Sequence, residues 1–180
     1  MRAVVLSEPA LAPTDRLFGD AVEHLARKLG RVKPLDAAAV PETRPEALVA
    51  LAAWAGTDVS PWEQELARFY EEHLPVYLRP DPALNATIRA LRAAGVRLGA
   101  WSAGPPEAFA ALLHQLGLTR RLDATLIDPT PRAPLRLAAE LGIEAIAVVA
   151  VTADLATASA AEDAGMRVVP DAIGLERLVA

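Results

Sequence analysis

The second half of the sequence alternates short apolar segments with segments of helical periodicity, and this alternation constrains the fold more than any other feature. The apolar segments cover residues 96–101, 123–127, 145–151 and 167–169, and a similar segment, 2–6, opens the chain. Runs rich in branched apolar residues are typical of strands that are buried on both faces of a parallel sheet. The pattern therefore predicts an α/β protein in which a doubly wound parallel sheet is flanked by helices.

Capping and stop residues mark the ends of the helices between these strands. Helices are expected to open at Asp81 with Pro82, at Pro105, at Thr130 with Pro131 and at Asp154, and to stop at Gly95, Gly117, Gly142 and Gly165. A capping residue or proline commonly marks the start of a helix, and a glycine commonly marks its end. A tail helix over residues 173–179 is expected to close the fold.

The residues between the first two strands form a helical block instead of a single crossover helix. Ser60 to Glu63 matches a capping box and opens a helix. The aromatic residues at helical spacing, Trp62, Phe69, Tyr70 and Tyr77, are expected to be core instead of a ligand cage. We therefore predict an inserted helical cap over residues 15–78 and a core domain made of residues 1–14 and 79–180.

Composition excludes several classes of protein. The chain has 180 residues and a net charge of -5, with no basic cluster that would bind nucleic acid. It lacks a membrane-length apolar segment and a leader pattern, so we expect a cytoplasmic protein with no membrane partner. Cysteine is absent, which excludes thiolate chemistry. Few asparagines, glutamines and methionines, together with fifteen prolines, suit either a heat-adapted host or a GC-rich genome.

Two long stretches of the chain resemble the haloacid dehalogenase (HAD) superfamily, in the branch with a helical cap after the first strand. Residues 78–126, which include WSAGPP at 101–106, resemble its proline-led helix, second strand and Ser/Thr-ended turn. Residues 137–169, which include AGM at 164–166, are similar to its fourth strand, acidic turn and following segment. The resemblance implies a Rossmann-like (HAD-like) sheet and Mg²⁺-dependent hydrolysis through an aspartyl intermediate.

The residues at the family's catalytic positions do not match that chemistry. Aligned on the family's first motif, Ser7 takes the place of the nucleophilic aspartate and Pro9 that of the general acid. Thr130 takes the place of the lysine, and no lysine follows Lys33. In the acidic turn, Ala150 replaces the first aspartate, while Asp154 is a weak candidate metal ligand that is also a suitable helix cap. These positions predict degenerate catalytic motifs and make Mg²⁺ binding doubtful.

The family's second motif is the one that the sequence retains. Ser102, Ala103 and Gly104 lie between a strand end and a helix start, where free N–H groups and the helix dipole favour an anion. These residues are therefore candidates for binding phosphate, although Ser102 or Gly104 could also simply cap the helix.

Other polar residues could in principle rebuild a site at the carboxyl edge of the sheet. Glu8, Asp128 and Asp154 would meet Ser7 there, and Arg132 could add a positive charge. Glu8 would need a twist in the loop, because successive strand residues point to opposite faces. The three histidines have no Ser/His/Asp spacing and suggest no catalysis.

Three hypotheses about function follow from these residues. The first is a HAD-fold protein that has lost phosphatase and dehalogenase chemistry and acts as a binding or regulatory module. Its ligand could be a phosphate-type anion or a small phosphorylated molecule, and a protein partner is a further option. The second is a divergent HAD phosphatase acting on a small phosphorylated metabolite. The third is another doubly wound α/β ligand-binding domain.

Overall fold

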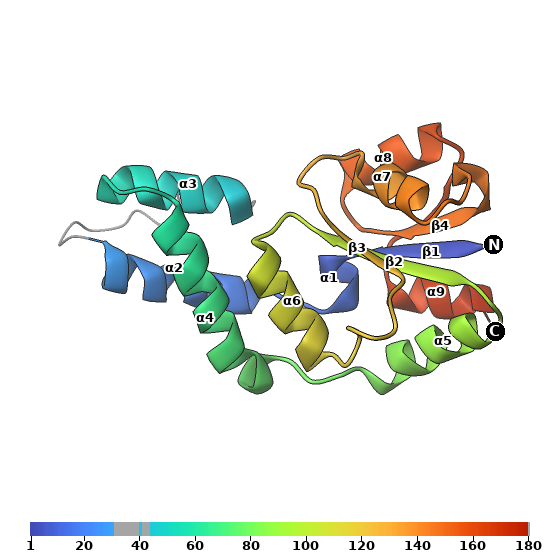
Figure 1. Cartoon of the computed structure of the whole chain (residues 1–180), viewed down its shortest axis with the longest axis horizontal. Coiled ribbons are helices and arrows are strands. Elements are labelled where there is room, and N and C mark those ends of the chain that lie inside the picture. Colours follow the sequence, from blue (N-terminus) through green and yellow to red (C-terminus); the bar gives the residue numbers. More distant parts are fainter. Residues whose placement is uncertain (31–39, 41–43, 180) are drawn as a thin grey trace.

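The structure is a computed structural model that describes residues 1–30, 40 and 44–179. Its strands are β1 (Ala3–Ser7), β2 (Arg97–Ser102), β3 (Ala124–Ile127), β4 (Val148–Val151) and β5 (Arg167–Val169). They form one parallel sheet in the order β3-β2-β1-β4-β5 (Figure 1). Val5 in the central strand lies opposite Gly99 on one side and Ala150 on the other. The predicted α/β class and parallel sheet are confirmed.

Helices lie on both faces of the sheet and in a block at its carboxyl end. They are α1 (Glu8–Leu11), α2 (Asp15–Leu29), α3 (Arg44–Ala55), α4 (Ser60–Tyr77), α5 (Pro82–Ala93), α6 (Pro106–Gln115), α7 (Ala133–Glu140), α8 (Leu155–Asp163) and α9 (Ala172–Val179). Helices α7 and α8 cover one face, and α5 and α9 cover the other (Figure 1). Helices α2, α3 and α4 lie together to one side of the sheet, and α6 packs against α4.

Alternate residues of the buried strands divide the core between the two faces. Ala3 and Val5 belong to a cluster with α7, whereas Val4 and Leu6 belong to a larger cluster on the other face. That alternation is the geometry expected of a strand with both faces covered. Gly99 permits the close approach of α7, because a Cβ atom there would lie 2.9 Å from the side chain of Leu137.

The larger cluster continues into the helical block. Trp62, Phe69 and Tyr70 on α4 are buried in the same cluster as Leu6, and Tyr77 packs partly buried against it. These aromatic residues are therefore core, as predicted. The division into an inserted cap over residues 15–78 and a core domain over 1–14 and 79–180 stays a prediction.

Three local expectations were wrong. Residues 145–147 form a 3₁₀ turn, and β4 begins only at Val148, because Ala147 N–H bonds back to the Glu144 carbonyl. Ser60 is the first residue of α4 and does not cap it; the cap position is Val59. Helix α7 begins at Ala133, not at Thr130.

The later helix start leaves Thr130 in a turn. Its backbone N–H bonds to the Asp128 side chain, so residues 128–132 form a turn that precedes the helix in the chain.

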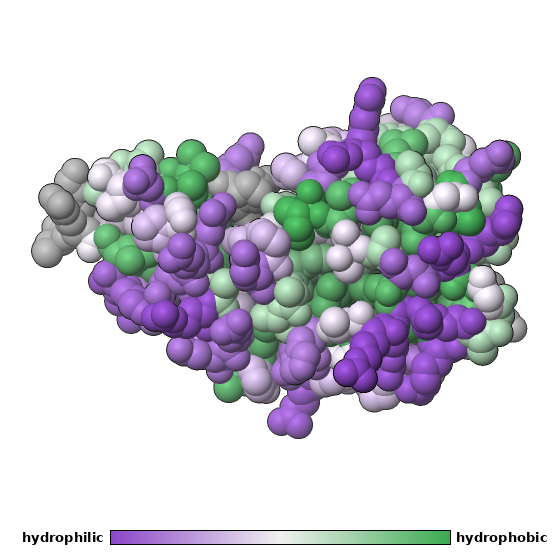
Figure 2. Space-filling model, viewed as in Figure 1, coloured by the Kyte–Doolittle hydropathy of each residue, from purple (hydrophilic) through white to green (hydrophobic). Residues whose placement is uncertain are grey.

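Figure 2 shows polar side chains over much of the visible surface of the molecule. Within the described ranges, no helix combines the length and apolarity needed to cross a membrane.

Candidate functional site at the carboxyl edge of the sheet

Four candidate polar residues lie at the ends of neighbouring strands, on the edge where open α/β sheets bind ligands. Ser7 and Ser102 are the last residues of β1 and β2, and Asp128 and Asp154 follow β3 and β4. The backbone N–H of Asp128 bonds to the Ser102 carbonyl at 2.9 Å, so β2 and β3 remain paired to the edge. The topology therefore brings these residues to one end of the sheet, as the sequence predicts.

Ser7 stands where the resemblance places the nucleophilic aspartate. Its side chain is buried, and its hydroxyl has no hydrogen-bond partner among the residues that the structure describes. A serine needs a base within hydrogen-bond distance before it can attack an electrophile. No described residue fills that role for Ser7.

Glu8 reaches the site through a helical turn, where the sequence predicted a loop. The chain does not continue as a loop after β1 but turns at once into α1, with Pro9 in the first turn. Pro9 is exposed there, and its fixed φ suits a helix start. The helical turn supplies the twist that Glu8 needs: its buried carboxylate accepts a hydrogen bond of 2.5 Å from the hydroxyl of Ser102.

We use the name cradle for Ser102, Ala103 and Gly104, which join β2 to the start of α6. The N–H of Gly104 donates to the Ser102 hydroxyl at 2.9 Å, and that hydroxyl donates to Glu8. Neither Ser102 nor Gly104 is the cap residue of α6, because that position is Pro105. The cradle therefore forms a short hydrogen-bonded chain that ends on a buried carboxylate.

The Asp128 carboxylate accepts hydrogen bonds from two residues that follow it in the chain. Its carboxylate accepts from the Thr130 N–H at 2.9 Å and from the Arg136 guanidinium at 2.8 Å. Burial alone raises the pKa of Asp128, but these hydrogen bonds and the charge of Arg136 outweigh it and lower the pKa. The cation beside Asp128 is therefore Arg136, one turn into α7, and not Arg132, which the sequence suggested as a source of positive charge.

Asp154 caps α8, as its position before Leu155 suggested. Its carboxylate accepts from the Thr157 N–H at 2.7 Å, and its own N–H donates to the Thr152 hydroxyl at 3.2 Å. Ala150 is fully buried within β4, where it contributes a methyl group to the core. Neither residue offers the paired oxygens of an acidic metal-binding turn.

The donor set does not fit Mg²⁺, which requires several oxygen ligands in octahedral geometry. The carboxylates of Glu8, Asp128 and Asp154 are each engaged by a hydroxyl, a guanidinium or a backbone N–H. In the described part of the chain, no group of three acidic or histidine side chains is arranged to hold a metal ion. We therefore derive no chemistry through a metal at this edge.

Comparison with known proteins establishes the family. The sequence model of the haloacid dehalogenase-like hydrolases matches residues 11–165, which is most of the chain. The protein therefore belongs to the haloacid dehalogenase-like hydrolase family. The match begins after Ser7 and Pro9, the two residues that the resemblance aligns with the first catalytic motif. A search of curated proteins found no relative that matches.

Solved structures of the same fold cover almost the whole chain. CbbY from Rhodobacter sphaeroides, in complex with phosphate, has a TM-score of 0.77 and 19% identity over 94% of this chain and 86% of its own. A β-phosphoglucomutase from Clostridium difficile has a TM-score of 0.70 and 16% identity over 94% and 84%. A dehalogenase in an intermediate complex has a TM-score of 0.59 and 21% identity over 94% and 84%. At these identities the similarity establishes the fold alone.

Proposed function

We propose that this protein is a HAD-fold binding or regulatory module that does not transfer phosphoryl groups through an aspartyl intermediate. The observation that carries the proposal is Ser7 at the carboxyl end of β1, a buried hydroxyl with no activating base among the described residues. Pro9 cannot transfer a proton, and Thr130 carries no charge. Removing only the nucleophile of an enzyme typically costs several powers of ten in rate.

The ligand that we propose is a phosphate-type anion or a small phosphorylated molecule held at the cradle. CbbY, which shares the fold, has been crystallised with phosphate, and a mutant of it with xylulose-1,5-bisphosphate. Ser102 and Gly104 provide a hydroxyl and a backbone N–H beside the start of a ten-residue helix, which is a favourable place for an anion. Because the edge carboxylates have other partners, we expect binding to need no Mg²⁺.

Two measurements on the purified protein test this proposal. The first is turnover of a generic phosphomonoester and a panel of haloacids with Mg²⁺ present, for which we expect no rate above that of buffer. The second is thermal stabilisation by millimolar inorganic phosphate, which we expect to be equal with and without Mg²⁺ and to weaken in Ser102→Ala. Glu140→Ala, which removes an exposed acid at the far end of α7, is the control.

A different result would favour the divergent phosphatase. Mg²⁺-dependent turnover that is lost in Asp154→Ala would contradict the proposal, because it would mean that the edge carboxylates can hold a metal during catalysis. The third hypothesis, a different doubly wound family, no longer applies because the chain belongs to the HAD family.

A further inference from the structure

The strongest unexplained feature of the molecule is the position of the Glu8 side chain. Only 3% of this residue is exposed, and its carboxylate accepts the hydroxyl proton of Ser102 at 2.5 Å. The two residues are 94 positions apart in the sequence and meet where β1 and β2 end side by side. A buried carboxylate therefore lies at the hydroxyl that the cradle would offer to an anion.

The contact with Glu8 matters because the cradle has few protons to donate to an anion. A serine hydroxyl has a single proton to donate, and Ser102 gives it to Glu8. The N–H of Gly104 is also occupied, because it donates to the Ser102 oxygen at 2.9 Å. An ionised phosphate oxygen, like a carboxylate oxygen, accepts hydrogen bonds, so it needs the Ser102 proton that Glu8 takes.

We propose that Glu8 competes with bound anions for the cradle and acts as an internal stand-in for the ligand. The inference rests on the proposed anion site and adds what controls it. While Glu8 contacts Ser102, phosphate meets an occupied donor and a nearby negative charge. When the carboxylate withdraws, the hydroxyl proton of Ser102 becomes available to the ligand.

The position of Glu8 in the chain links this competition to the helical block. Glu8 is the first residue of α1, a single helical turn that packs on β1 and β2. Only residues 12–14 separate α1 from α2, the first helix of the block at the side of the sheet. A ligand or partner that displaces α2 would therefore act on Glu8 through a three-residue connection.

The test measures the affinity of the full chain for inorganic phosphate by calorimetry and by ³¹P NMR line broadening. Glu8→Ala removes both the charge and the side chain from the cradle, and we expect it to bind phosphate at least about tenfold more tightly than the wild type. Glu8→Gln keeps the side-chain volume and an acceptor oxygen for Ser102 while removing the charge. We expect a smaller gain in phosphate affinity for Glu8→Gln. This variant still tests the proposal if Glu8→Ala does not fold.

Two further variants show whether a gain arises at the cradle. Ser102→Ala in the Glu8→Ala background should return the affinity to the wild-type value or below. Glu140→Ala, with the same change in net charge but at an exposed position, should bind phosphate as the wild type does. A gain in Glu140→Ala equal to that in Glu8→Ala would overturn the proposal, because it would reflect net charge alone.

The remaining outcomes also decide the question. Unchanged or weaker phosphate affinity in folded Glu8→Ala and Glu8→Gln would overturn the competition, since it would make Glu8 a neutral neighbour or a part of the ligand site. Failure of the proposed function is a separate result, seen as Mg²⁺-dependent turnover by the wild type. The two failures are therefore distinguishable in the same set of proteins.

Discussion

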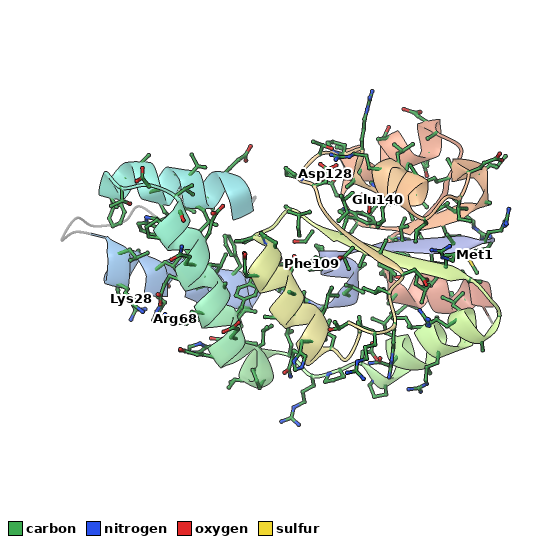
Figure 3. The ribbon with its side chains drawn as sticks, viewed as in Figure 1. Met1, Lys28, Arg68, Phe109, Asp128 and Glu140 are labelled. Atoms are coloured by element: carbon green, nitrogen blue, oxygen red, sulfur yellow. The ribbon has the colours of Figure 1, made fainter. Side chains whose placement is uncertain are left out.

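Two buried glutamates, Glu65 in the helical block and Glu8 at the sheet edge, have different surroundings. Glu65 on α4 lies 2.5 Å from the Lys28 ammonium, 3.3 Å from the His24 ring nitrogen and 3.9 Å from the Arg68 guanidinium. Figure 3 shows Lys28 and Arg68 close together where α2 and α4 cross. Glu8 instead accepts the hydroxyl proton of Ser102. The same type of side chain therefore pairs with cations between helices in one region and with a serine hydroxyl at the sheet edge in the other.

The electrostatics of Glu65 agree with a structural role. Burial by itself raises the pKa of Glu65, but hydrogen bonds from Lys28 and His24 and the charges of Lys28 and Arg68 outweigh burial and lower the pKa. A carboxylate whose charge is matched by neighbours from two helices contributes to folding stability. We expect Glu8, which accepts the Ser102 hydroxyl proton, to contribute less to folding stability than Glu65 does.

The largest expected effect that tests this comparison is on the free energy of unfolding. Glu65→Ala leaves Lys28 and His24 without their shared partner, and we expect a loss of about 1–3 kcal/mol, below the full cost of a buried pair because the cations are partly solvated. Chemical denaturation measures it. Glu72→Ala, exposed on the same helix, should stay within about 0.5 kcal/mol of the wild type. A larger loss in Glu8→Ala than in Glu65→Ala would break the comparison.

The pH dependence of stability sharpens the comparison further. Because the folded-state pKa of Glu65 lies below its ordinary value of 4.5, the unfolded chain binds more protons as the pH falls. The contribution of Glu65 is therefore complete above about pH 4.5 and is lost as the pH falls through the lower folded-state pKa. We expect Glu65→Gln to be less stable than the wild type at pH 7, and we expect this difference to shrink as the pH falls below 4.5. A constant difference between the two proteins across that range would contradict this reading.

The smallest expected effect concerns Asp128, an edge carboxylate that has a cationic partner as Glu65 does. Asp128→Asn keeps an acceptor for the Thr130 N–H but loses the charge that pairs with Arg136, and we expect it to cost about 1 kcal/mol of stability. The exposure of Arg136 limits the effect, since its side chain is 62% accessible. Adding Arg136→Ala completes a double-mutant cycle. No coupling between the two changes would mean that the pair contributes nothing.

The sequence predicted most elements of the fold because the necessary signals are local. Apolar runs located the strands, and Asp81 and Asp154 cap their helices with the bonds that the sequence suggests. The errors fall where a short-range hydrogen bond closes a turn in place of the regular element that the residue pattern predicts. Thr130 does not open α7 because the Asp128 side chain holds its N–H in a turn, and residues 145–147 tighten into a 3₁₀ turn before β4.

Some features of the candidate site could be predicted from the sequence, and others appear only in the tertiary structure. The resemblance to the family, together with residue type, predicted that Ser7 and Pro9 stand in the places of two aspartates, and the sequence itself shows that no lysine follows Lys33. Only the tertiary structure brought Glu8 to Ser102 and Arg136 to Asp128. Such contacts depend on how α1 turns after β1 and how α7 packs on the sheet, and these arrangements are set by the packing of the whole core and not by neighbouring residues.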